Sequence, residues 1–504
     1  MFEKILIVNR GEIARRIILA CRELGITSAA IYSEVDAAAP WVRLADESYA
    51  LQGITAAETY LNQAAVFDIA SRCGADAIHP GYGFLSENPS FAAACTAHDI
   101  TFIGPSADAM RLLGNKAEAR ILAAAAGVPV VPGVDGAGKN DEQLLAEAKT
   151  IGFPLLIKAS AGGGGKGMRI VETDDKFAVA LRMARNEAQS SFGDDHILVE
   201  KYFQQIHHVE IQVLGDRHGN LLHLFERECS IQRRYQKIIE ESPAPVIENE
   251  QLRQEMAAAA LRLAQAAGYE NAGTVEFVVT ENGRFYFLEM NTRLQVEHPV
   301  TELVTGLDLV NWQIRVAAGE PLPFVQQEIS QRGHALECRI YAEDPANEFL
   351  PSTGKLAHYR PPAGPGVRVD DGLETGSEIT PYYDPMLGKV ITRGHDRQEA
   401  IRKMVRALRD MIVLGVTTNI PYLLAILEEP HFGDGKTSTN YLKEHMAGWS
   451  PPEMAAEEAV LAAAVFEYLQ GGEKRTTAEN RAADESGDRT NPWHDLPSWR
   501  NLQA

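Results

Sequence analysis

The stretch IKASAGGGGKGM, residues 157–168, gives the strongest indication of the fold. An apolar run ends at Lys158 and leads into four consecutive glycines, whose backbone can adopt conformations and make close approaches that other residues cannot. Such a loop can wrap phosphate groups with its amide N–H groups. The chain has no GxxxxGK[ST] spacing here and no GxGxxG after its first strand, so the P-loop and the Rossmann dinucleotide site are both excluded.

Order along the chain separates a phosphate site from the alternative, a flexible surface loop. Lys116 precedes the glycine loop, and the pair Glu200 and Lys201 ends the next apolar run. Carboxylates follow on a later predicted strand. This succession resembles the ATP-grasp superfamily, and the resemblance implies a nucleotide site assembled from several separate segments.

Two apolar segments around a short turn, GTVEFVV (273–279) and FYFLEMNTR (285–293), predict an antiparallel strand pair. Glu276 and Glu289 can then face each other, and Asn291 lies on the same strand face as Glu289 because side chains alternate. Three oxygen ligands of this kind suit Mg²⁺ bound with a nucleotide and do not suit zinc.

Polar residues continue at two-residue spacing through EMNTRLQVEHPVTE, residues 289–302. We expect one extended strand that presents Glu289, Asn291, Arg293, Gln295 and Glu297 on a single face. A surface ladder of salt bridges is the alternative, but strands usually keep one face apolar, and this row has no packing rationale. The pattern therefore favours a functional site.

The remaining chain is predicted to be a multidomain α/β and α+β protein. Apolar runs at 5–8, 28–32, 77–79 and 101–104 alternate with helical stretches, which indicates parallel βαβ units. The expected parts are an N-terminal α/β domain (1–114), a connector (115–129), an α+β lid (130–203), an antiparallel-sheet region (204–446), a C-terminal helix (447–471) and a flexible tail (472–504) that is a possible docking segment.

The C-terminal helix is predicted from a capping-box spacing between Ser450 and Glu453, with Pro451 at the first helical position. Apolar residues at helical spacing follow, namely Val460, Leu461, Ala464, Val465 and Tyr468. The tail after it is polar and charged, so it has little to bury against the entropy of ordering.

Bulk composition narrows the class of protein. The 504 residues carry a net charge of −21 that is scattered along the chain, which argues for solubility and against a nucleic-acid partner. There is no long apolar span or signal-peptide pattern, so we expect a cytoplasmic protein with no membrane association. The five cysteines are far apart and contain no CxxC pair, so we expect them to be reduced and mostly buried.

Five motifs in order carry a resemblance to a known family: NRGEIARR (9–16), HPGYGFLSEN (79–88), ECSIQRRYQKIIEESP (228–243), EMNTRLQVEHPVTE (289–302) and ECRIYAED (337–344). Together they resemble the biotin carboxylase family of the ATP-grasp superfamily, over about residues 1–445. The resemblance implies an ATP-grasp fold with an N-terminal Rossmann-like domain, a mobile glycine-rich lid and a C-terminal antiparallel sheet. It implies carboxylation of biotin at N1, through carboxyphosphate, using ATP, bicarbonate and Mg²⁺ or Mn²⁺.

Site residues follow from the resemblance. It implies Glu276, Glu289 and Asn291 as metal ligands. The implied ATP-binding residues are Lys116, Lys158, Gly163, Gly164, Gly165, Lys166, Met168, Glu200, Lys201, Phe203, His208, Gln232, Glu276 and Glu289. The implied bicarbonate-binding residues are Lys237, Arg293, Gln295, Val296 and Glu297, of which Glu297 is the base. Lys237, Arg293, Glu297 and Arg339 are the implied catalytic residues, and Tyr82, Gly83 and Arg339 the biotin-binding ones.

Departures from the family pattern are Tyr235, where many relatives carry His, and Asn115, where Asp is common. They put nucleotide affinity in doubt. His207 and His208 are neighbours in a predicted strand and face opposite ways, so we do not expect a shared metal ion.

The resemblance also implies partners. The chain contains no Met-Lys-Met biotinylation triplet and no carboxyltransferase segment, so we expect a homodimer that works with a separate biotin carboxyl carrier protein and a carboxyltransferase subunit. The expected role is the first half-reaction of an acetyl- or propionyl-CoA carboxylase, as in fatty acid biosynthesis. The alternatives are the biotin carboxylase subunit of a two-subunit pyruvate carboxylase, a different ATP-grasp ligase acting on a small amine, or a subunit without catalysis.

Overall fold

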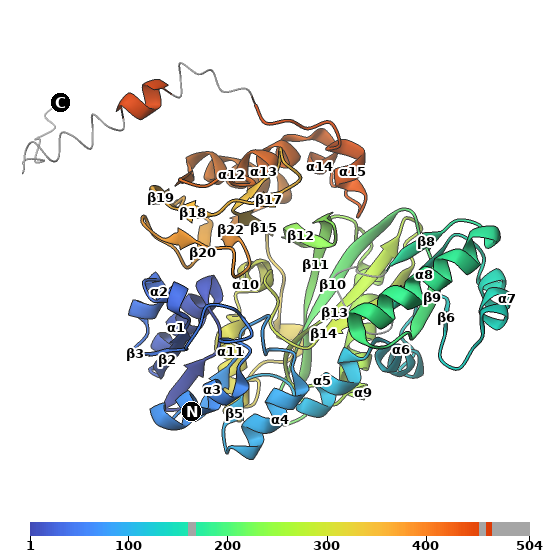
Figure 1. The fold of residues 1–504 in the computed structure, drawn as a ribbon, viewed down its shortest axis with the longest axis horizontal. Coiled ribbons are helices and arrows are strands. Elements are labelled where there is room, and N and C mark those ends of the chain that lie inside the picture. Colours follow the sequence, from blue (N-terminus) through green and yellow to red (C-terminus); the bar gives the residue numbers. More distant parts are fainter. Residues whose placement is uncertain (160–167, 453–459, 466–504) are drawn as a thin grey trace, which may run out of the picture. The chain divides into compact units, whose positions relative to one another are not determined.

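The computed structural model describes residues 1–159, 168–452 and 460–465 (Figure 1). Residues Met1–Trp449 form one compact unit and Ser450–Ala504 a second. Among the described helices, none has the length and apolar character needed to cross a membrane. The glycine loop from 160 to 167 and the predicted tail lie outside the described residues.

The N-terminal part is a five-stranded parallel sheet in the order β3-β2-β1-β4-β5, as the alternating pattern predicted. Its strands are β1 (Lys4–Ile7), β2 (Thr27–Tyr32), β3 (Glu47–Ala50), β4 (Ala77–His79) and β5 (Thr101–Phe102). The helices of this part are α1 (Gly11–Leu24), α2 (Pro40–Leu44), α3 (Gln63–Cys73), α4 (Pro89–Ala97) and α5 (Ala107–Gly114). The edge strand β3 was not predicted, because it is short and none of its residues is buried.

The next part is a four-stranded antiparallel sheet in the order β6-β9-β7-β8. Its strands are β6 (Gly133–Asp135), β7 (Leu155–Ala159), β8 (Arg169–Val171) and β9 (Ile197–Lys201). Helices α7 (Asp141–Ile151) and α8 (Asp174–Phe192) pack on it. The predicted connector before it holds a regular helix, α6 (Lys116–Ala125), whose N-cap is Asn115.

An eight-stranded antiparallel sheet runs through the rest of the unit in the order β14-β13-β10-β11-β12-β15-β22-β20 (Figure 1). Its strands are β10 (Ile206–Gly215), β11 (Leu221–Arg233), β12 (Gln236–Ser242), β13 (Asn271–Thr280), β14 (Phe285–Asn291), β15 (His334–Tyr341), β20 (Val367–Asp371) and β22 (Met386–Gly394). Around it are α9 (Glu250–Ala266), α10 (His298–Thr305), α11 (Leu309–Ala317), α12 (Arg397–Asp410), α13 (Ile420–Glu428), α14 (Pro430–Gly433) and α15 (Tyr441–His445).

Alternation along β10 divides the sheet into an apolar face and a polar face. Val209, Ile211 and Val213 are buried in a core with residues of α6 and α9. The residues that alternate with them, His208, Glu210 and Gln212, are also buried but are polar. Because a buried charge needs a partner, this second face is the place to look for a site.

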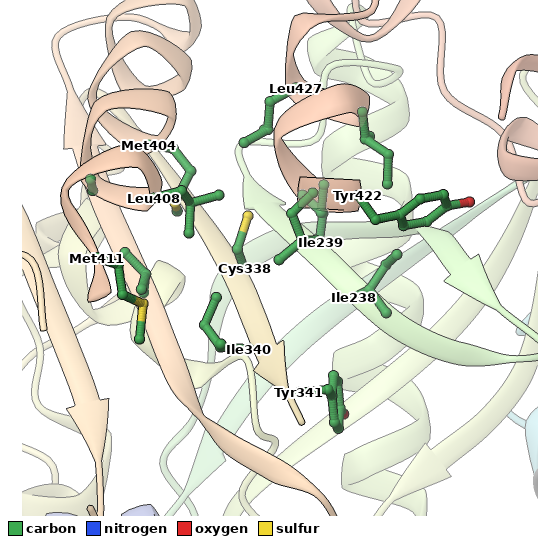
Figure 2. Close-up of a cluster of buried hydrophobic side chains, with 14 of the residues drawn as sticks. Ile238, Ile239, Cys338, Ile340, Tyr341, Met404, Leu408, Met411, Tyr422 and Leu427 are labelled. Carbon is green, nitrogen blue, oxygen red and sulfur yellow. The ribbon is translucent and has the colours of Figure 1, made fainter. Parts of the chain in front are cut away.

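The core of the C-terminal part packs α12 and α13 onto β12, β15 and β22 (Figure 2). Ile239 and Cys338 are register partners on neighbouring strands, and Met404 and Leu408 of α12 belong to the same buried cluster. This packing fixes β12 and β15, which carry two of the charged residues described below.

Two predictions about local structure are wrong. The strand that holds Glu289 ends at Asn291, and a turn over residues 292–297 leads directly into α10, so Glu297 is not on a strand. The predicted helix start at Pro451 is also wrong, since Pro451 and Pro452 are not helical. Pro451 is followed by Pro452, and a residue before proline is disfavoured in the α conformation, which accounts for the non-helical backbone at Pro451. Residues 460–465 are helical, and Val460, Leu461 and Val465 are exposed.

Candidate active site

The polar face of the eight-stranded sheet borders a cavity of about 320 Å³. The cavity is bordered by residues of seven strands, which are β7, β10, β11, β12, β13, β14 and β15. The residues around it are Lys116, Lys158, Ala159, Met168, His208, Gln232, Tyr235, Gln236, Lys237, Glu276, Leu288, Glu289, Asn291, Arg293, Gln295, Val296 and Arg339. Most residues predicted for ATP and bicarbonate therefore come together.

Lys237 on β12 is the centre of a buried charge network. Its ammonium Nζ lies 2.6 Å from Glu210 Oε2, 2.9 Å from Glu276 Oε1 and 2.6 Å from Glu297 Oε1. Burial alone would raise the pKa of Glu276, but Lys237 and His208 together outweigh burial and lower that pKa to about 2. Three carboxylates can be buried side by side because Lys237 contacts all of them and each has a second cationic partner.

Glu297 is fully buried at the N-terminus of α10. Its Oε1 accepts from Lys237, and its Oε2 accepts from Arg339 Nη2 on β15 at 2.9 Å. Burial opposes ionisation, yet Lys237 and Arg339 hold the pKa of Glu297 below its ordinary value. At neutral pH this residue is therefore a carboxylate and can accept a proton.

Glu276 and Glu289 are register partners across β13 and β14, as predicted from the sequence. The register shifts by one residue just beyond this pair, a bulge of the kind that re-aims side chains. Glu289 Oε2 lies 2.5 Å from Lys116 Nζ, and Asn291 Nδ2 donates to Glu276 Oε1 at 2.8 Å. Two carboxylates and an amide beside a lysine are hard oxygen donors, which fit Mg²⁺.

Arg293 follows β14 and reaches across to the N-terminal part. Its Nε donates to Glu87 Oε2 at 2.9 Å, and its Nη1 donates to Gln295 Oε1 at 2.9 Å. The Val296 carbonyl accepts from the buried Lys389 Nζ at 2.6 Å. The turn after β14 thus brings together the residues that a strand was predicted to align.

The other residues predicted for ATP are placed less uniformly. Met168, Gln232 and His208 border the cavity, whereas Glu200 faces Lys158 at 2.6 Å and Arg120 at 3.1 Å. Lys201 donates to two backbone carbonyls, and the Phe203 ring stacks on Tyr286; neither borders the cavity. The predicted residues Gly163, Gly164, Gly165 and Lys166 lie outside the described residues.

His208 and His207 point to opposite sides of β10, as expected. His208 Nε2 lies 3.2 Å from Glu276 Oε2, whereas His207 Nδ1 lies 3.4 Å from Glu228 Oε1. Burial favours a neutral imidazole, but Glu276 and Glu210 together outweigh burial and raise the pKa of His208 to about 9. His208 therefore adds a positive charge beside the oxygen donors.

A second cavity of about 530 Å³ lies between the N-terminal part and β15, with Tyr82 and Gly83 on its border. Arg293, Val296 and Arg339 border both cavities. The Tyr82 hydroxyl donates to Glu12, whose carboxylate lies 3.1 Å from Lys389. The residues predicted for biotin and those predicted for bicarbonate therefore border adjoining cavities.

Several members of the network were not predicted: Glu12, Glu87, Glu210, Glu240 and Lys389. One signal was available for Glu210. It lies two residues after His208, so a strand at this position puts both on one face.

The two departures from the family pattern have different settings. Tyr235 is 60% exposed at the mouth of the first cavity. Asn115 accepts from the backbone N–H groups of Ala117 and Glu118 and so caps α6, a role that Asp would fill equally well. The five cysteines are buried and free, as expected.

Three family models match the chain in succession. They are the biotin carboxylase N-terminal domain (residues 1–110), the ATP-binding domain of the carbamoyl-phosphate synthase L chain (115–325) and the biotin carboxylase C-terminal domain (337–444). The middle match covers the four-stranded sheet β6-β9-β7-β8 and the strands β10 to β14 that border the first cavity.

Relatives have different names. Biotin carboxylase 1 of Bacillus subtilis is 49% identical over 88% of this chain and 99% of its own length, and a pyruvate carboxylase subunit of Methanothermobacter thermautotrophicus is 50% identical over 89% and 91%. The alpha subunit of methylcrotonoyl-CoA carboxylase from Dictyostelium discoideum is 45% identical over 99% of this chain and 70% of its own length.

A solved structure has the same fold. The biotin carboxylase domain of Hydrogenobacter thermophilus 2-oxoglutarate carboxylase, in complex with MgADP, ADP and bicarbonate, has a TM-score of 0.86 and 47% identity over 90% of this chain and all of its own. The charge network and the two adjoining cavities agree with the three successive domain matches. On this evidence the chain belongs to the biotin carboxylase family of ATP-grasp ligases, which use ATP to carboxylate biotin.

Proposed function

We propose that this chain uses MgATP and bicarbonate to carboxylate N1 of biotin held on a separate carrier protein, as the first half-reaction of an acyl-CoA carboxylase. The observation that carries the assignment is the buried Glu297 carboxylate, which borders neither cavity itself but is held between Lys237, which borders the first cavity, and Arg339, which borders both. A base at this position can act on a substrate in the first cavity while its arginine partner faces the second.

In the first step, Glu297 accepts the proton of bicarbonate, and a bicarbonate oxygen attacks the γ-phosphorus of ATP to give carboxyphosphate and ADP. Lys237 and Arg293 offset the negative charge that would otherwise keep two anions apart. Gln295 and the backbone of Val296 complete the bicarbonate contacts. The direct pairs of Lys237 with Glu276 and Glu297 would loosen as substrate oxygens take their place.

The nucleotide is assigned to the same cavity. Lys116 and Lys158 pair with Glu289 and Glu200 in the absence of phosphates and would exchange these partners for phosphate oxygens. Glu276, Glu289 and Asn291 would hold Mg²⁺, or Mn²⁺, which when bound neutralises phosphate charge. The glycine loop, Met168, His208 and Gln232 are assigned to the phosphates and ribose, and Glu200, Lys201 and Phe203 to the adenine.

In the second step, carboxyphosphate decomposes to CO2 and phosphate, the phosphate takes the N1 proton of biotin, and N1 attacks CO2. The biotin enolate oxygen needs a cation, and the permanently charged guanidinium of Arg339 suits that role. Tyr82 and Gly83 are assigned to the biotin side of the second cavity.

The share of this chain that aligns with one relative favours an acyl-CoA acceptor. The alignment with the methylcrotonoyl-CoA carboxylase relative covers 99% of this chain, whereas that with biotin carboxylase 1 covers 88%. Pyruvate is the second candidate acceptor, because a pyruvate carboxylase subunit is 50% identical. The proposed partners are a carrier protein and a carboxyltransferase subunit, with residues 472–504 serving for docking and a homodimer for the oligomeric state.

The test measures ADP release from MgATP by the purified chain, with and without bicarbonate and free biotin. Bicarbonate-dependent release that biotin stimulates is the expected outcome. Nucleotide binding without any effect of biotin would contradict the proposal. Adding acetyl-CoA, propionyl-CoA, methylcrotonoyl-CoA or pyruvate to the reconstituted holoenzyme then identifies the acceptor.

A further inference from the structure

Three potential metal ligands meet on the C-terminal helices, far along the chain from the active-site residues. Glu429 lies between α13 and α14, His431 is in α14, and His445 ends α15. Glu429 Oε1 lies 2.7 Å from His431 Nδ1 and 3.9 Å from His445 Nδ1. One donor atom from each of the three residues can be chosen so that all lie within 4.8 Å of one another.

We propose that Glu429, His431 and His445 form a binding site for a transition-metal ion of the Zn²⁺ type. Two imidazole nitrogens and one carboxylate oxygen are a ligand set that zinc uses, with water at the fourth tetrahedral position. Imidazole ligands select zinc, copper or nickel over the oxygen-seeking Mg²⁺ and Ca²⁺. When both ions are present, Zn²⁺ would therefore bind at this site and Mg²⁺ at the oxygen ligands of the active site.

The glutamate is held from behind in the way that metal-binding carboxylates usually are. Glu429 Oε2 accepts from the Tyr441 hydroxyl at 2.5 Å and from the backbone N–H of Phe432 at 3.1 Å, which leaves Oε1 toward the two histidines. Glu429 Oε1 is therefore oriented toward the histidines before any ion arrives.

A helix cap alone does not account for the cluster. Capping α14 requires only the contact between Glu429 and the Phe432 N–H group. It does not require His445, which comes from a different helix and places its ring centroid 4.4 Å from that of His431. A shared ion would join these two imidazoles from different helices.

The position of α15 gives such an ion a structural consequence. Asn440 Nδ2 donates to the Gln204 carbonyl at 2.6 Å, the Thr439 N–H to the Ile206 carbonyl at 2.9 Å, and Gln205 Nε2 to Glu444 Oε1 at 2.7 Å. Residues 204 and 205 belong to the segment that joins β9 of the four-stranded sheet to β10. An ion that ties α15 to α14 would therefore stabilise this connecting segment.

The experiment titrates Zn²⁺ into the chelator-treated full chain, in excess MgATP so that the active-site ligands are occupied. Glu429→Gln, His431→Gln and His445→Gln are the test variants, since glutamine retains the size and, at position 429, the capping oxygen. His196→Gln is the matched control, because His196 pairs with the single carboxylate of Asp135. Bicarbonate-dependent ADP release without zinc checks that each variant is folded.

We expect one tight Zn²⁺ site in the wild type and the control, and at least about 100-fold weaker binding in each test variant, because even groups behind metal ligands contribute about 10–100-fold. Zinc should raise the Tm of the wild type and the control only. Equal zinc affinity in wild type and test variants would overturn the proposal. If a variant does not fold, Co²⁺ bound to the wild type decides: lack of the strong visible absorption of tetrahedral Co²⁺ would equally overturn it.

Discussion

Glu240 and Glu241 are neighbours on β12, equally buried, and face opposite sides of the same sheet. Glu240 contacts Arg339 at 2.5 Å on the active-site side. Burial, together with the nearby Glu297 carboxylate, raises the pKa of Glu240 to about 7. Its register partner on β15 is Glu337, another buried carboxyl whose pKa is raised well above the ordinary value by burial.

Glu241 has the opposite surroundings. It accepts from Arg397 Nε at 2.6 Å and Nη2 at 3.0 Å, and from His334 Nε2 at 2.7 Å. Burial opposes ionisation, but Arg397 and His334 lower the pKa of Glu241 to about 2. The comparison teaches that the neighbouring charges, and not burial, decide whether the pKa of a buried carboxyl is raised or lowered. Glu240 has acidic neighbours on the active-site face, whereas Glu241 is paired with cationic groups on the other face.

The largest expected effect is that of Glu297→Gln on the active-site face. The amide cannot accept the bicarbonate proton, so bicarbonate-dependent ADP release should fall by about 10²–10⁴-fold. Equilibrium binding of ATP, measured calorimetrically, serves as the control and should be largely retained. Turnover near that of the wild type would remove Glu297 from the role of base.

The two arginines test the comparison directly. Arg339→Gln should lower biotin-dependent turnover by about 10²–10³-fold, because a cation at the developing oxyanion is lost. Arg397→Gln should leave turnover per folded molecule near that of the wild type and lower the denaturant midpoint, because it leaves buried Glu241 with one partner fewer. The same kinetic defect in both variants would erase the distinction between the two faces.

Glu241→Gln should destabilise the fold by about 3 kcal/mol near pH 7, since breaking one side of a buried ion pair is costly. The folded pKa of about 2 lies below the ordinary value of 4.5, so the contribution of Glu241 is fully present above pH 4.5 and is lost as pH falls toward 2. Urea midpoints of the wild type and the variant should therefore converge as the pH is lowered. A constant difference at all pH values would contradict the assigned pKa.

Glu240→Gln should have the smallest effect and the opposite pH dependence. The folded pKa of about 7 lies above 4.5, so the stability that Glu240 contributes is fully present below pH 4.5 and is lost as pH rises through 7. Between pH 5 and 6, inside the window from 4.5 to about 7, the variant should gain at most about 1.4 kcal/mol relative to the wild type, the slope for one proton, and the difference should level off above pH 7. Urea midpoints across this range measure the gain, and its absence would indicate that Glu240 is ionised throughout.

The sequence was a good guide to repeated patterns and a poor guide to unique contacts. Period-two and βαβ patterns predicted the parallel sheet, the pairing of β13 with β14 and the facing of Glu276 and Glu289. The strand through Glu297 was wrong because a turn can also bring alternating polar residues together. Local spacing does not distinguish the two arrangements.

The network partners Glu12, Glu87 and Lys389 could not be predicted for a different reason. Each contacts the site from a segment far away in sequence, as Glu87 contacts Arg293 across 206 positions. Only the packing of the N-terminal part beside the sheet creates such pairs. The family resemblance supplied the residues of the reaction, whereas the supporting charges required coordinates.

The wall between the two cavities has one consequence for an unstable intermediate. Arg293, Val296 and Arg339 border both spaces, so only these side chains separate a molecule formed on one side from the other. Leakage, and with it the ATP spent per biotin carboxylated, would then depend on how one valine and two arginines pack. Coupling efficiency is therefore a property of side-chain packing at this wall and can change while every reacting group stays in place.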